Sequence, residues 1–273
     1  IWLRELGANV YGASLNVNSN PSLYKSSNLK NKIYKNYKVD IRNSILVNKI
    51  INEIKPDFIF HLAAQALVLD SIQNPIFTFE TNSIGTLNIL NSLRFYNKNI
   101  NVIIVTSDKC YENLDLNRPF KETDRMGGKD PYSASKGCAE IILNSFIKTY
   151  FENRPNIRLA IARAGNVIGG GDWSNNRLIP DCIKSIYENK ICNIRSPNST
   201  RPWQHVLEPL YGYLVLGYYL KKKHKNTNFN AFNFGPKTNI LTVLDIVKVI
   251  KRVFPEYNYK IIKSSSIESK FLK

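Results

Sequence analysis

Short, continuously apolar segments alternate with helix-like segments along most of this chain, and this alternation limits the possible folds more than any other feature. The predicted strands are residues 58–62, 102–105 and 158–162. Apolar positions with helical periodicity predict helices over about 45–54, 76–96 and 132–150. Buried strands separated by helices are typical of a parallel sheet that is covered on both faces. The sequence therefore predicts an α/β fold with a doubly wound parallel sheet.

The pattern becomes less regular after Gly165. We predict helices over about 178–187, 209–220 and 243–253, and a strand at 232–234. We interpret residues 1–165 as a Rossmann-type domain whose sheet is completed by about 203–235. Residues 166–202 and 236–273 would then form a smaller substrate-binding lobe.

Composition and hydropathy argue against a nucleic-acid-binding protein and a membrane protein. The net charge of +17, from 38 basic and 21 acidic residues, allows a nucleic-acid partner. The lysines are dispersed, however, and the one dense run, 221–225, follows a predicted helix, where cations suit the helix dipole. We therefore expect no nucleic-acid partner. The absence of a long apolar stretch and of a basic-then-apolar leader predicts no membrane partner and a cytoplasmic location.

The cysteines carry no sign of a metal site. Cys110, Cys138, Cys182 and Cys192 lack the paired spacing that zinc sites show. A disulfide framework is not indicated in a chain this long, and reduced thiols agree with a cytosolic setting. We expect no metal.

Polar residues follow the apolar run 102–105 directly. They are Thr106, Ser107, Asp108 and Lys109. Ligands of open α/β sheets bind outside the carboxyl ends of the strands, so these side chains mark a candidate site. Taken alone, Asp108 could equally cap a turn and Lys109 could be solvated.

A tyrosine and a lysine stand four positions apart at the start of the next predicted helix. At this spacing Tyr132 and Lys136 share one helix face, so the positive charge of the lysine would favour the phenolate. A tyrosine tuned in this way accepts a proton from a sugar hydroxyl near neutral pH. Taken alone, the pair is explained equally well by an exposed helix face. The polar run 106–109 upstream makes the pair informative.

Four runs of the sequence together resemble a known family. They are 106–111 (TSDKCY), 126–132 (MGGKDPY), 163–173 (RAGNVIGGGDW) and 201–209 (RPWQHVLEP). They are similar to the CDP-glucose 4,6-dehydratases, a branch of the extended short-chain dehydrogenases/reductases. The resemblance extends from Leu3 to about Ile262. The Tyr-x-x-x-Lys element indicates only the superfamily, whereas the glycine-tryptophan and Arg-Pro-Trp-Gln-His runs indicate the CDP-sugar branch.

The resemblance implies dehydration of CDP-glucose to CDP-4-keto-6-deoxyglucose through transient oxidation by bound NAD, for deoxysugar and surface polysaccharide (lipopolysaccharide) synthesis. Tyr132 would take the proton of the 4-hydroxyl, and Lys136 would hold the phenolate and the nicotinamide ribose. Asp108 is the candidate acid for the departing 6-hydroxyl, and Lys109 the candidate base for carbon 5. Many related dehydratases carry glutamate at that position. Ser107 would hydrogen-bond the 4-hydroxyl.

The resemblance also implies binding residues. Those for the cofactor are Asp40, Ile41, Leu62, Ala63, Ala64, Gln65 and Asn82, together with Tyr132 and Lys136. Those for the substrate are Asn166, Arg177, Arg201 and His205, beside a glycine loop at 169–171. Rival interpretations are a helix N-cap for Asp40, helix packing for Asn82, and packing beside Trp203 for His205. His61 is interpreted as a packed residue at a strand end.

The choice of cofactor and the start of the chain raise two further expectations. Residues 14–16 carry neither an acid for the adenosine ribose nor an arginine, so NAD is favoured over NADP. Nucleotide-binding α/β domains begin with a central strand and a Gly-rich turn that holds the pyrophosphate. The chain instead opens in helix-like residues that end at Gly7. We expect an N-terminally truncated domain, and poor cofactor binding by these 273 residues alone.

Two other functions compete with the dehydratase. One is an NAD-dependent sugar-nucleotide epimerase or reductase of the same superfamily, which would not need the Asp108 and Lys109 pair. The other is an inactive fragment that only binds. We expect a nucleotide-sugar substrate, CDP-glucose, and a homo-oligomer.

Overall fold

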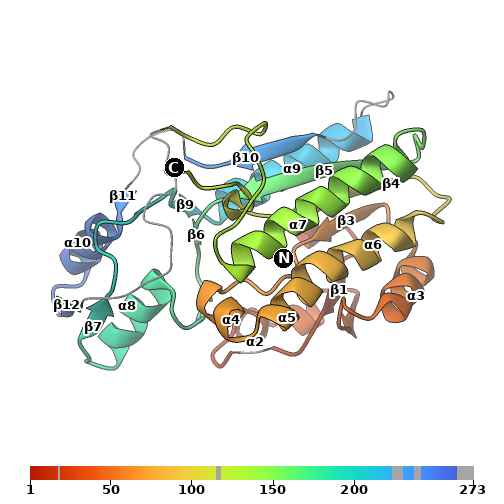
Figure 1. Cartoon of the computed structure of the whole chain (residues 1–273). Helices are drawn as coiled ribbons and strands as arrows, with labels where there is room; N and C mark the ends of the chain where they lie inside the picture. The colour runs from red at the N-terminus through yellow and green to blue at the C-terminus, as the bar shows by residue number, and fades with distance from the viewer. Residues whose placement is uncertain (18, 115–117, 223–229, 237–240, 263–273) are drawn as a thin grey trace.

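A parallel four-stranded sheet forms the centre of the molecule, in the order β10-β5-β4-β3 (Figure 1). The computed structural model describes residues 1–17, 19–114, 118–222, 230–236 and 241–262. The strands are β3 (Phe58–His61), β4 (Ile100–Val105), β5 (Ile157–Ala164) and β10 (Ala231–Phe234). β4 is buried along almost its whole length, as expected for a strand covered on both faces. The predicted α/β fold with a Rossmann-type sheet is confirmed.

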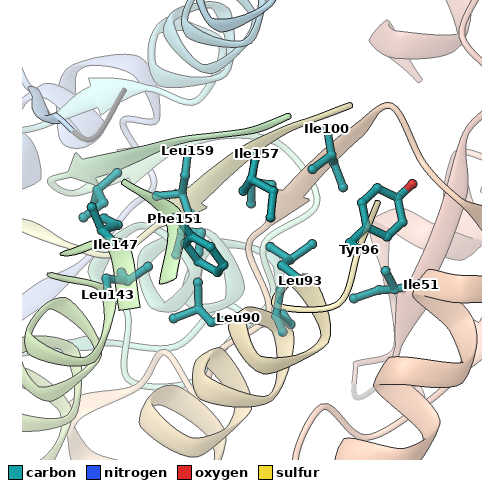
Figure 2. Packing of buried hydrophobic residues seen from close by; sticks show 14 of the residues in the cluster. Ile51, Leu90, Leu93, Tyr96, Ile100, Leu143, Ile147, Phe151, Ile157 and Leu159 are labelled. Carbon is teal, nitrogen blue, oxygen red and sulfur yellow. The ribbon is translucent and has the colours of Figure 1, made fainter. Parts of the chain in front are cut away.

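Helices cover both faces of this sheet. On one face lie α3 (Ser44–Ile54), α6 (Gly85–Leu93) and α7 (Pro131–Phe146). Figure 2 shows Leu90, Leu93 and Leu143 from these helices packing against Ile157 and Leu159 of β5. On the other face lies α9 (Leu207–Lys222). The sheet is therefore sandwiched between two helical layers, and its carboxyl end carries the polar residues.

A small N-terminal sheet lies beside the central one. Strands β1 (Tyr11–Ser14) and β2 (Lys35–Lys38) pair in parallel. Within the described ranges, no strand hydrogen-bonds this pair to β3. The region 16–36 is polar and rich in Asn, Ser and Lys, a composition that predicts a loop, and this prediction is wrong. The region contains α2 (Leu23–Ser26), the 3₁₀ turn η1 (Leu29–Asn31) and the start of β2, and polar composition concealed them.

The last part of the chain forms a third core. Its elements are α8 (Leu178–Tyr187), β7 (Cys192–Ile194), α10 (Val243–Val253) and β12 (Tyr259–Ile261). Their apolar side chains pack together around Cys182, Val247 and Tyr257. Two short pairs, β6 (Val167–Ile168) with β9 (Gln204–His205) and β8 (Thr200–Arg201) with β11 (Leu241–Thr242), lie between this core and the central sheet.

The remaining elements are short. They are α1 (Trp2–Glu5), α4 (Val68–Gln73), α5 (Pro75–Phe79), the π turns η2 (Glu80–Ile84) and η4 (Ile147–Phe151), and the 3₁₀ turn η3 (Asp108–Cys110). The predicted helix over 76–96 corresponds to α5, η2 and α6. Most of the lysine run 221–225 lies outside the described residues. No helix in the described part is both long and apolar enough to cross a membrane.

Candidate active site

The predicted Tyr–Lys pair lies at the capped start of α7. The Asp130 carboxylate accepts hydrogen bonds from the Ser133 amide at 2.9 Å and the Ser133 hydroxyl at 2.7 Å. Pro131 occupies the first helical turn, where its missing N–H costs nothing. This N-cap fixes where the helix begins. Tyr132 and Lys136 are therefore held one turn apart at its N-terminal end.

The tip of β4 lies against the same helix. Ser107 caps η3, because its Oγ accepts from the Lys109 amide at 3.2 Å and donates to Asp108 Oδ1 at 2.9 Å. A Cβ at Gly137, next to Lys136, would lie 2.9 Å from the Gly127 carbonyl oxygen. Only glycine allows this approach. The same Cβ would lie 3.3 Å from the Cys110 carbonyl oxygen of η3, so Gly137 lets α7 lie close to the strand tip.

Both segments line one cavity of about 830 Å³. All five predicted catalytic residues contribute to its wall, and they are Ser107, Asp108, Lys109, Tyr132 and Lys136. So do six of the predicted binding residues, namely Leu62, Ala64, Asn166, Arg177, Arg201 and His205. Five others are not among the lining residues of this cavity, namely Asp40, Ile41, Ala63, Gln65 and Asn82.

Burial shifts the pKa values of Tyr132 and Lys136 on α7. It lowers the pKa of Lys136 to about 8, while Cys110 and Glu140 act in the opposite direction. Burial also raises the pKa of Tyr132 to about 12. The groups that lower the Tyr132 pKa most are Ser107 and Arg177, not the Lys136 predicted for that task. The phenol is thus a proton donor and acceptor at the cavity wall rather than a preformed phenolate.

Asp108 has the environment of a carboxylic acid. Burial raises its pKa, outweighing the opposite influence of Lys109 and the Ser107 hydrogen bond. Its Oδ2 atom is buried without a hydrogen-bond partner among the described residues. An unpaired neutral oxygen costs less than an unpaired charge. A Cβ at Gly165 would lie 3.3 Å from this oxygen and 2.5 Å from Cγ of Pro202, so glycine keeps this corner open.

The turn after β3 is fastened to α7 through Asn82. Its Oδ1 accepts from the Gln65 amide at 2.8 Å, and its Nδ2 donates to the Gln65 carbonyl at 3.0 Å and to Ser135 Oγ at 2.9 Å. Asn82 therefore shapes the turn that presents Leu62 and Ala64 to the cavity. His61 is buried, lies 3.0 Å from the Thr86 hydroxyl, and has its pKa lowered by burial to about 3. It is packed, in agreement with the interpretation from sequence.

Asp40 and Ile41 occupy the loop between β2 and α3. The Asp40 carboxylate is bound by Arg42, with Nη2 to Oδ2 at 2.7 Å, and this pair lowers the pKa of Asp40. Asn43, not Asp40, caps α3, so the N-cap interpretation of Asp40 is wrong. Ile41 packs against the core under α6.

The predicted substrate residues approach the cavity from its far wall. Arg177 Nη1 lies 3.3 Å from the Asp172 carboxylate, and Arg201 is buried with Nη1 donating to the Thr200 carbonyl at 2.7 Å. His205 is exposed, and its Nδ1 accepts from the Leu207 amide at 3.3 Å. The Asn166 carbonyl accepts from the Gln204 amide at 3.0 Å, which ties the two loops together.

Sequence reasoning missed a buried polar cluster behind the site. It consists of Thr106, Tyr111, Glu140 and Arg163. Glu140 is fully buried and pairs with Arg163, Nε to Oε1 at 2.8 Å. The available signal was an arginine that directly follows the apolar run of β5, because a charge so placed requires a partner.

Comparison with known proteins agrees with this geometry. Residues 3–232 match the family described as GDP-mannose 4,6 dehydratase. The CDP-glucose 4,6-dehydratase of Salmonella typhimurium is 42% identical over 241 residues, which cover 87% of this chain and 67% of that protein. The UDP-glucose 4-epimerase of Mycoplasma genitalium is 28% identical, over 78% of this chain and 66% of that protein. The chain thus spans about two thirds of the length of these relatives.

A solved structure supports the fold. DesIV of Streptomyces venezuelae, a dTDP-glucose 4,6-dehydratase with NAD and TYD bound, superposes with a TM-score of 0.73 at 20% identity. The match covers 87% of this chain and 70% of DesIV. With the family match over residues 3–232, the helix-start pair and the strand-tip acid have a common explanation: the chain belongs to the GDP-mannose 4,6-dehydratase family.

Proposed function

We propose that this chain is a nucleotide-sugar 4,6-dehydratase, a hydro-lyase that acts on CDP-glucose with NAD. One observation carries the proposal: the Tyr132–Lys136 pair of α7 and the Ser107, Asp108 and Lys109 tip of β4 line the same cavity. Oxidation and elimination groups are then within reach of one sugar. The 42% identity to the CDP-glucose enzyme supports the choice of cytidine.

The first task of the site is to remove a proton from the sugar 4-hydroxyl. Tyr132 would take this proton, because its phenol lies at the cavity wall. Burial raises the pKa of this phenol to about 12, and Ser107 and Arg177 oppose that rise. The Ser107 hydroxyl would hold the 4-hydroxyl in place. With the hydride of carbon 4 accepted by bound NAD, the sugar would become a 4-ketone, which acidifies the hydrogen on carbon 5.

The second task is the loss of water across carbons 5 and 6. Lys109 would accept the proton of carbon 5, and Asp108 would donate a proton to the departing 6-hydroxyl. Burial raises the pKa of Asp108, which favours the acid form that this step needs. One C–H and one C–O bond break, a carbon–carbon double bond forms, and water leaves.

The residues present fit the nicotinamide end of NAD. NAD, when bound, supplies the oxidation at carbon 4 and the later reduction at carbon 6. Lys136 Nζ is buried, and its contact with the Val105 carbonyl is long, at 3.5 Å. An ammonium has three donors, so N–H groups are available for ribose hydroxyls. Leu62 and Ala64 would face the nicotinamide ring, with Ala63 between them in the chain. Asn82 and Gln65 would hold the turn that contains these three residues.

The far wall of the cavity would bind the nucleotide part of the substrate. Arg177 and Arg201 would pair with the diphosphate, and Asn166 and His205 would contribute polar contacts. The adenosine end of NAD would lie toward Asp40 and Ile41, outside this cavity. Residues 1–165 with β10 would then serve the cofactor, and the α8–α10 lobe would serve the substrate.

The alternative is a sugar-nucleotide epimerase, favoured by the similarity to a UDP-glucose 4-epimerase. An epimerase needs the oxidation step but no acid for the 6-hydroxyl. The buried Asp108 with its raised pKa argues for the dehydratase.

The test offers the full-length protein CDP-glucose, UDP-glucose and dTDP-glucose, each with NAD, and follows the product by mass spectrometry. We expect a 4-keto-6-deoxy sugar nucleotide, formed fastest from CDP-glucose. Conversion to an isomer of unchanged mass would indicate the epimerase. Failure with all three substrates would refute the assignment.

We further propose that the product enters deoxysugar synthesis for surface polysaccharide, that the protein works in the cytoplasm, and that it forms a homo-oligomer. Exposed apolar side chains such as Ile141 on α7 and Phe95 after α6 support the oligomer. Size-exclusion chromatography with light scattering tests it.

A further inference from the structure

A buried ion pair connects two of the segments that surround the proposed site. Glu140 of α7 and Arg163 of β5 meet side by side, with Nε to Oε1 at 2.8 Å and Nη2 to Oε2 at 2.9 Å. Their side chains are 0% and 3% exposed. This bidentate geometry fixes both the distance and the relative orientation of the helix and the strand.

The same carboxylate also holds the tip of β4. Thr106 Oγ1 donates to Glu140 Oε1 at 2.6 Å. Thr106 directly precedes Ser107 and Asp108, and Glu140 lies one helical turn beyond Lys136. Glu140 is therefore a direct link between the elimination residues and the Tyr–Lys pair.

The arginine extends the link to the segment that leaves the strand tip. Arg163 Nη1 donates to the Tyr111 hydroxyl at 2.7 Å, and that hydroxyl donates to Asn233 Oδ1 at 2.6 Å. Arg163 Nη1 also donates to the Glu122 carbonyl at 2.9 Å. Tyr111 stands three residues after Asp108, so the strand tip is anchored on both its sides.

The cost of burying an ion pair indicates that this cluster positions residues of the site rather than adding stability. A buried ion pair is often no more stabilising than apolar residues of the same volume, because two charges lose their hydration. Thr106 lies in the cavity wall, whereas Glu140, Arg163 and Tyr111 are not among the residues that line the cavity. A misplacement of about 1 Å in a catalytic group can cost about 100-fold in rate, so a rigid link has a functional value.

We propose that Thr106, Glu140, Arg163 and Tyr111 form a positioning brace that holds Asp108 and Lys109 in register with Tyr132 and Lys136. The brace rests on the proposed function, because it concerns the elimination step of that reaction. Tyr132 and Lys136 both lie on α7, whose start is fixed separately by the Asp130 cap. Loosening the brace therefore impairs elimination more than oxidation.

The experiment compares Thr106→Val and Tyr111→Phe with the wild type, using CDP-glucose and NAD. Each variant removes one hydroxyl from the brace with little change in shape. We expect kcat to fall about 10-fold with KM within about twofold of wild type. The fraction of sugar that is oxidised but still carries its 6-hydroxyl, measured by mass after quenching, should rise.

Two controls separate positioning from loop stability. Thr106→Ser keeps the hydroxyl and should restore kcat and the product ratio. Arg118→Ala breaks an exposed ion pair with Asp124, at 2.7 Å in the same connecting segment, and should leave both unchanged. Circular dichroism confirms that each variant is folded.

The brace is refuted if Thr106→Val and Tyr111→Phe change only the melting temperature, or raise KM at wild-type kcat. It is also refuted if Thr106→Ser behaves like Thr106→Val. A wild-type protein that gives no dehydrated product contradicts the proposed function itself, which the substrate comparison detects independently of the variants.

Discussion

Two of the ion-pair clusters among the described residues differ in burial, and we call them the buried and the solvated anchor. Under the proposed catalytic residues, Glu140 and Arg163 have side chains 0% and 3% exposed. Beside the small N-terminal sheet, Arg42 pairs with Asp40 and with Glu80, and these three side chains are between 29% and 48% exposed. The buried ion pair thus lies where the proposed catalytic groups must be held in a fixed geometry. The loop after β2 is held by a solvated pair.

The strands beside each anchor differ in the same way. β4 is buried along nearly its whole length, whereas β1 and β2 have no fully buried residue. Exposed pairs contribute little to stability because water screens them. The comparison indicates that the sheet around β4 and β5 carries most of the stability, and the β1–β2 pair little.

The largest expected loss of stability follows from a change at the buried anchor, the Glu140–Arg163 pair. Arg163→Met leaves Glu140 buried and unpaired, so the free energy of unfolding should fall by about 3–5 kcal/mol. Arg42→Met, the matched change at the solvated anchor, should cost less than about 1 kcal/mol. Urea unfolding measures both. Similar losses for the two variants would contradict the distinction between the anchors.

A smaller effect concerns the buried lysine of the site. Because burial lowers the pKa of Lys136 to about 8, the folded protein carries an unfavourable charge below that pH. Lys136→Met should therefore raise stability at pH 7 by about 1–3 kcal/mol while abolishing activity. The gain should shrink between about pH 8 and the ordinary lysine value of 10.5, as the folded wild type loses its proton.

Stability measured by urea unfolding at several pH values tests this sign. Lys35→Met serves as the control, because Lys35 is exposed and its contacts with Glu53 and the Tyr37 ring lie at the surface. It should give no such pH-dependent gain. A Lys136→Met variant that is destabilised at pH 7 would show that its charge is compensated in the fold.

The smallest expected effect is at Asp40. Its carboxylate is bound by Arg42, so Asp40→Asn should weaken NAD binding by less than about threefold and stability by less than about 1 kcal/mol. Isothermal titration calorimetry measures the affinity. A loss above about tenfold would favour the direct cofactor contact that the resemblance implies for Asp40.

Much of the fold could be predicted because burial leaves a periodic pattern. The apolar runs that became β3, β4 and β5, and the helix Val243–Val253, were recognisable from local sequence. The region 16–36 was not, since a helix of one turn capped by Ser22 has the same polar composition as a loop. The sequence also gave no sign of the π turn that divides the helix after Pro75.

The site was predictable where chemistry follows local order along the chain. Tyr132 and Lys136 share a helix face, and Asp108 lies just beyond the carboxyl end of β4, so their meeting follows from topology. The Glu140–Arg163 pair was not predicted, because it depends on a contact between residues 23 positions apart in sequence. The Asp40–Arg42 pair was not predicted either, although the two residues are close in sequence. An arginine at that position could equally have pointed to solvent.

The most direct test of the dehydratase assignment is the product made from CDP-glucose by wild type and by Asp108→Asn, with NAD present. We expect the wild type to release a 4-keto-6-deoxy sugar nucleotide. Asp108→Asn should still oxidise carbon 4 but should lose water at least about 100-fold more slowly, so the hydroxylated 4-ketone accumulates. Dehydration by Asp108→Asn at the wild-type rate would contradict the proposal that Asp108 and the Tyr132–Lys136 pair form one elimination site.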